Sequence, residues 1–99
     1  MVGSMTALKI DMPLDAGIER AVHCLRDRGI ETVESCEGGD GHSFPEPTVR
    51  FHGHHGEGYR ALAVALELGL PVLALKRVWT VINGELTGPL WELTLRERL

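Results

Sequence analysis

Two stretches of this chain have helical periodicity, and both end with the same signal. Apolar residues recur at every third or fourth position from Leu14 onward and again from about Tyr59 onward, which is the period of an amphipathic helix. The first pattern ends at Gly29-Ile30 and the second at Gly69-Leu70. A glycine followed by an apolar residue is typical of a left-handed helix C-cap. The chain therefore needs a fold that covers one apolar face on each of two helices.

Strand patterns lie between and after the two helices. Residues 30–35 are rich in β-branched side chains, and residues 48–52 alternate between apolar and polar, which predicts two strands. A further short strand is predicted over residues 7–10. After the second helix, residues 72–82 form a long apolar and β-branched run, which we interpret as one strand.

The clearest hairpin signal follows that long run. Asn83-Gly84 supplies two residues that readily adopt positive φ, as a type I′ turn requires. The returning strand passes Gly88-Pro89, where we expect a bulge because proline cannot donate to the ladder, and then alternates over residues 91–96.

These elements predict one α+β domain. Their order is β-α-β-β-α-β-β, which favours a two-layer sandwich, a mainly antiparallel sheet with two helices on one face, as a ferredoxin-like variant. Ninety-nine residues suffice for a single domain. We assign it to residues 5–99, because residues 1–4 precede a second methionine and resemble a cloning scar. The side chains expected in the core or on the sheet are Phe51, Trp79, Val81, Trp91 and Leu93.

Composition narrows the classes of partner. Hydrophobic residues make up 43% of the chain and charged residues 24%, the mixture of a folded globular domain. A formal net charge of −4 disfavours nucleic acid and anionic lipid as partners. We expect no membrane span, a cytoplasmic location and no cofactor. Cys24 and Cys36 have neither disulfide-framework nor CxxC spacing, and we expect free thiols.

The residues most able to support chemistry lie in one glycine-rich loop. Glycines allow backbone N–H groups to converge on an anion, and the adjoining strand adds Arg50 and His52 on its polar face. We therefore expect a small polar or anionic ligand to bind the loop and this strand face. The predicted ligand-binding residues are Ser35, Cys36, Glu37, Gly38, Gly39, His42, Arg50 and His52.

Three alternatives belong to other classes. Cys36 could act as a nucleophile with His42 as its base and the amides of residues 37–39 as an oxyanion hole. Cys36, Asp40 and His42 have the side chains of a metal site, although we expect no metal. A homodimer that buries part of the open sheet face, with no ligand, is the third alternative.

The same loop carries a family resemblance. The run Ser35-Cys36-Glu37-Gly38-Gly39, followed by His42 and a strand, resembles a group of small uncharacterised bacterial and phage-type proteins with a strand-SCxG-loop-His-strand segment. The resemblance covers about a third of the chain and implies no known activity.

A second glycine motif lies at the start of the second helix. Gly56, Gly58 and Ala61 fit the letters of a G-x-G-x-x-A dinucleotide fingerprint. The acidic residue expected about 20 positions further on is missing, and the chain is too short for a doubly wound domain. The remaining prediction from this motif is that the N-terminus of the second helix could bind an anion through its free N–H groups.

Overall fold

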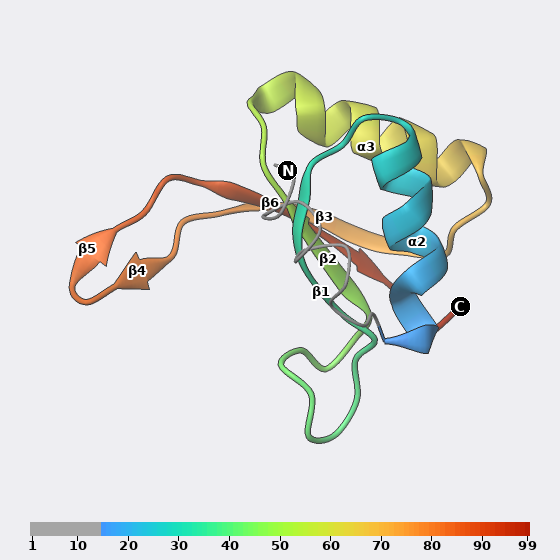
Figure 1. Ribbon diagram of the computed structural model, residues 1–99, viewed down its shortest axis with the longest axis horizontal. Coiled ribbons are helices and arrows are strands. Elements are labelled where there is room, and N and C mark those ends of the chain that lie inside the picture. The colour runs from blue at the N-terminus through green and yellow to red at the C-terminus, as the bar shows by residue number, and fades with distance from the viewer. Residues whose placement is uncertain (1–14) are drawn as a thin grey trace, which may run out of the picture.

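The computed structural model describes residues 15–99, which form two helices and six strands (Figure 1). Their order is α2 (Ala16–Asp27), β1 (Thr32–Cys36), β2 (Thr48–Phe51), α3 (His55–Glu67), β3 (Val72–Val78), β4 (Val81–Ile82), β5 (Glu85–Leu86) and β6 (Leu90–Leu95). Four strands make an antiparallel sheet in the order β1-β2-β6-β3, and β4 pairs with β5 separately. The predicted α+β class with a mainly antiparallel sheet is confirmed.

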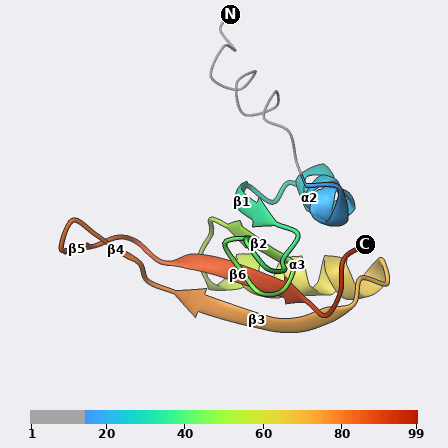
Figure 2. The same ribbon diagram turned by 90° about the horizontal axis from the view of Figure 1, so that it is seen from below.

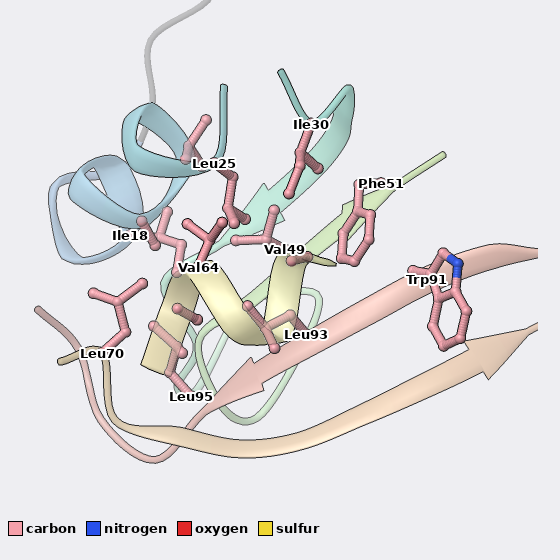
Figure 3. Close-up of a cluster of buried hydrophobic side chains, with 14 residues drawn as sticks. Ile18, Leu25, Ile30, Val49, Phe51, Val64, Leu70, Trp91, Leu93 and Leu95 are labelled. Atoms are coloured by element: carbon pink, nitrogen blue, oxygen red, sulfur yellow. The ribbon is translucent and has the colours of Figure 1, made fainter. Parts of the chain in front are cut away.

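Both helices pack on the same face of the sheet. Neighbouring partners in the ladder share a face, so Val49 and Leu93 point together toward the helices. They are completely buried, as are Ile18 on α2 and Ala65 on α3 (Figure 3). A single hydrophobic cluster thus joins α2, α3 and the two central strands.

The two predicted helix stops are present. Ile30 N–H donates to Leu25 O and Leu70 N–H donates to Ala65 O, which are the 6→1 hydrogen bonds of a Schellman cap. Gly29 and Gly69 take the positive φ of this motif. Helix α3 begins at His55, one turn before the predicted start at Tyr59.

The long strand predicted over residues 72–82 is interrupted. Strand β3 ends at Val78, and residues 79–89 form an arm that leaves the body and carries the β4–β5 hairpin (Figure 2). Asn83 and Gly84 have φ values of 53° and 79°, and Ile82 pairs with Glu85 across them, so the predicted two-residue turn is confirmed.

Of the five side chains expected in the core or on the sheet, two were placed wrongly. Trp79 and Val81 lie on the arm and are 55% and 64% exposed. Phe51, Trp91 and Leu93 are buried as expected. The arm extends past the edge of the helices, so neither helix covers it.

The ferredoxin-like strand order is not confirmed. The predicted strand over residues 7–10 lies outside the described residues, and the central place between β2 and β3 is taken by the C-terminal strand β6. Within residues 15–99, no helix is long and apolar enough to cross a membrane.

Candidate functional site

The glycine-rich loop after β1 is bonded to the first turn of α2. Asp15, the N-cap residue of α2, accepts the Glu37 N–H on Oδ2 at 3.1 Å. A second hydrogen bond joins the same two segments, since Glu37 Oε1 accepts the Gly17 N–H at 2.9 Å. A carboxylate at this place is stabilised by the helix N-terminus. The exchange fixes the loop after β1 against the start of the helix.

Three side chains of types that can bind a metal ion lie together beside this exchange. One ligand atom from each of Asp15, Cys36 and His42 lies within 4.8 Å of the other two. The thiol is buried, since Cys36 is only 5% exposed, whereas the other two side chains reach the surface. The sequence prediction paired Cys36 and His42 with Asp40, but the described residues place Asp15 in that position and leave Asp40 exposed outside the group.

The His42 ring lies between two carboxylates. Its Nδ1 is 3.8 Å from Asp15 Oδ2, and its Nε2 is 3.7 Å from Glu37 Oε2. Arg98 neutralises part of this negative charge, since its Nη1 lies 3.6 Å from Glu37 Oε2 and its Nη2 donates to Gly38 O at 2.7 Å. Each nitrogen of the His42 ring therefore has a carboxylate oxygen nearby.

The backbone N–H groups of residues 37–39 in the loop are already hydrogen-bonded within the protein. The Glu37 N–H is bound by Asp15, the Gly38 N–H donates to Cys36 Sγ at 3.4 Å, and the Gly39 N–H donates to Pro45 O at 3.0 Å. These three amides were predicted to form an oxyanion hole, within a glycine-rich loop that was predicted to bind an anion. In this conformation they have no N–H free for either role.

Arg50 is occupied as well. Its Nε donates to Glu92 Oε2 at 3.1 Å, and its Nη1 lies 3.4 Å from Glu34 Oε1. The Phe44 ring covers the guanidinium at 4.9 Å from its centroid. The Arg50 side chain is 20% exposed and that of Glu92 is 11% exposed. We therefore assign Arg50 to the scaffold, where it compensates a carboxylate on the sheet, and the anionic-ligand hypothesis loses its principal cation.

The remaining predicted residues do not converge on one point. Cys36 pairs with Thr48 at the start of β2, whereas His52 follows the other end of that strand and is exposed. Four residues of extended chain separate those ends by about 13 Å. Ser35 lies half-buried opposite Val49. The structure thus joins the loop residues to one another but leaves Arg50 and His52 apart from them.

The second glycine motif has a packing explanation. A Cβ built on Gly58 would lie 2.5 Å from the Trp91 indole, so glycine is needed for the helix to approach that ring. Trp91 Nε1 in turn donates to His54 O at 2.9 Å. The His54 side chain accepts the Gly56 N–H at 3.2 Å, so His54 caps the N-terminus of α3.

Sequence reasoning missed Asp15 and Arg98. An aspartate before a helical pattern is an ordinary N-cap signal, and that signal could have located Asp15 at the helix start without showing what it faces. Arg98 lies 60 residues from its partner Gly38, and no local pattern connects the two.

Neither a family model, nor a curated protein, nor a solved structure matches this chain in sequence or fold comparison.

Proposed function

We propose that this protein binds a transition-metal ion, with zinc as the best candidate, through Asp15, Cys36 and His42. The observation that supports this proposal is the meeting of a carboxylate, a thiol and an imidazole within 4.8 Å. The proposal departs from our sequence-based expectation that the protein has neither metal nor cofactor. It also replaces Asp40 by Asp15 among the ligands.

One of the ligand separations approaches that around a tetrahedral ion. Zinc bonds of about 2.0 to 2.3 Å hold neighbouring ligand atoms roughly 3.3 to 3.6 Å apart. The separation of 3.8 Å between His42 Nδ1 and Asp15 Oδ2 is close to this range. All three ligand atoms lie within 4.8 Å of one another, so binding of one ion requires them to move closer together.

The surroundings of His42 also favour a metal. A histidine that binds a metal through one nitrogen usually donates the other N–H to a carboxylate, which fixes its tautomer and orientation. Glu37 occupies that second place, 3.7 Å from Nε2, and is itself held by Gly17 and Arg98. Three protein ligands leave a fourth position for water or another molecule.

Other functions have less support. A cysteine nucleophile needs N–H donors aimed at the reacting oxygen, and the nearby amides are bound within the loop. Binding of an anionic ligand stays a prediction, with its expected arginine engaged by Glu34 and Glu92.

The test is a metal titration of protein first stripped with a chelator. Zinc should bind with a stoichiometry of one per chain, measured by calorimetry. Cobalt should give a thiolate charge-transfer absorption, which reports ligation by sulfur. Cys36→Ser should abolish that absorption, while Cys24→Ser is the matched control at the other free thiol.

A second pair of variants separates the structural prediction from the sequence prediction. Asp15→Asn keeps an oxygen that can accept the Glu37 N–H but removes the anionic ligand, so zinc affinity should fall at least tenfold. Asp40→Asn should leave it unchanged. Glu37→Gln should weaken binding by about 10- to 100-fold, as expected for a group that orients a ligand. Absence of stoichiometric binding, or equal binding by wild type, Cys36→Ser and Asp15→Asn, would refute the proposal.

A further inference from the structure

The arm of residues 79–89 exposes an unusual amount of apolar surface. Its large side chains are 55% exposed at Trp79, 64% at Val81, 60% at Ile82 and 68% at Leu86. Figures 1 and 2 show the arm extending from the sheet on the side away from both helices. In a folded domain, surface of this kind usually marks a contact with another molecule.

The arm also receives little support from the other residues that the structure describes. Within the described residues, β4 and β5 form a two-stranded sheet of two residues each, held further by the Thr87 N–H donating to Thr80 O at 2.8 Å. An isolated two-stranded hairpin is marginally stable in water and gains stability when an apolar face is covered.

We propose that the arm is the contact surface of a homodimer, in which the arms of two copies pack against each other around a two-fold axis. A two-fold contact uses the same surface on both copies, and an apolar arm with few charges is complementary to a second one. Among residues 79–89 the only ionisable side chain is Glu85. Two arms can therefore meet without burying a positive charge, and Glu85, which pairs with Ile82, lies on the face of the hairpin opposite Val81 and Leu86.

The available area fits a weak dimer contact. Val81 pairs with Leu86, whereas Ile82 pairs with Glu85, and cross-strand partners share a face of the hairpin. Val81 and Leu86 therefore lie on one face together with Trp79, two residues before Val81, and Ile82 lies on the other. The three exposed side chains of the first face offer on the order of 350 Å². Two arms then bury about 700 Å² from these side chains, which is the size of a weak, reversible contact.

A lipid surface fits this arm less well. Membrane-binding segments usually combine apolar residues with lysine or arginine, which attract anionic headgroups. The arm has no basic residue, and the chain has a net charge of −4. The proposed dimer contact also differs from our sequence-based alternative, which used the open sheet face.

The experiment measures the mass in solution by sedimentation equilibrium over a range of concentrations, with a chelator present so that metal plays no part. Wild type should show a reversible equilibrium between the 10.9 kDa chain and its dimer. Leu86→Glu should weaken dimerisation at least tenfold, because two carboxylates are brought into the apolar contact. Leu66→Glu is the matched control, since Leu66 is 60% exposed on α3, away from the arm.

A second measurement locates the contact. In a mixture of isotope-labelled and unlabelled copies, intermolecular nuclear Overhauser effects should join methyl groups of Val81 and Leu86. Circular dichroism should show that Leu86→Glu keeps the fold. A wild-type protein that stays monomeric at millimolar concentration would overturn the proposal. Equal weakening by Leu66→Glu, or binding of the arm to neutral lipid vesicles with no dimer in solution, would overturn it too. None of these outcomes affects the metal proposal.

Discussion

The contact between Gly58 and Trp91 offers a sharp test of why the second glycine motif exists. Gly58 is a buried residue within helix α3. An added Cβ would lie 2.5 to 2.6 Å from three atoms of the indole, much closer than a carbon contact allows. The indole cannot move away easily, because it is 8% exposed and bonded through Nε1 to His54 O. Phe51 lies against it with a centroid separation of 6.5 Å.

The magnitude follows from two opposing terms. Overpacking a core site costs about 1 to 3 kcal/mol, while alanine gains about 0.5 to 1 kcal/mol over glycine in a helix interior. Gly58→Ala should therefore lower the free energy of unfolding by roughly 0.5 to 2 kcal/mol. In a domain of this size each 1 kcal/mol shifts Tm by about 4 to 8 °C.

Gly56→Ala is the matched control for this experiment. It lies two residues earlier in the same helix, and its added Cβ would be 3.3 Å from Cε1 of the exposed His54 side chain, which can shift. Its stability should be equal to wild type or higher. Both variants are measured by urea denaturation and by thermal melting. If Gly58→Ala proves as stable as Gly56→Ala, the packing explanation of the motif is refuted.

Two further predictions concern the sheet and the loop. Arg50→Ala should lower the free energy of unfolding by about 1.5 to 3 kcal/mol, because it leaves the buried Glu92 carboxylate without its hydrogen-bonded cation; an unchanged urea midpoint would return Arg50 to the list of binding residues. Gly38→Ala should be more destabilising than Gly41→Ala. Both glycines have positive φ, of 84° and 82°, but only at Gly38 would the added Cβ meet backbone, 2.5 Å from the Glu46 carbonyl carbon. Equal melting temperatures for these two variants would contradict that reasoning.

Local patterns in the sequence were sufficient for most of the secondary structure. Helical periodicity with a Gly-apolar stop located both helix ends, and Asn83-Gly84 identified the hairpin turn. These signals succeed because the forces behind them act between residues at most a few positions apart. The α+β class then followed, since two amphipathic helices and several strands have few ways to cover their apolar faces.

The sequence also located the loop that carries the candidate site, but it grouped Cys36 and His42 with Asp40, where the structure places Asp15 beside them. It also took Arg50 for a free cation, whereas the structure pairs it with Glu34 and Glu92. Asp40 is two residues from His42 in the chain, whereas Asp15 reaches it only because α2 packs beside β1. The alternation over residues 48–52 predicts that Arg50 lies on the polar face of its strand. It does not indicate which residues of other strands contact the guanidinium. Glu92 comes from a strand 42 residues away, and the sheet register sets it opposite Arg50.

Tertiary structure alone decided which apolar residues are covered. Trp79 and Trp91 both follow strand patterns, yet one is 55% exposed and the other 8% exposed. The difference arises because the helices extend over β6 and end before the arm. Periodicity records that a residue is apolar and which face of its strand it takes. Whether another element covers that face depends on strand order and helix placement, which arise from contacts between residues far apart in the chain.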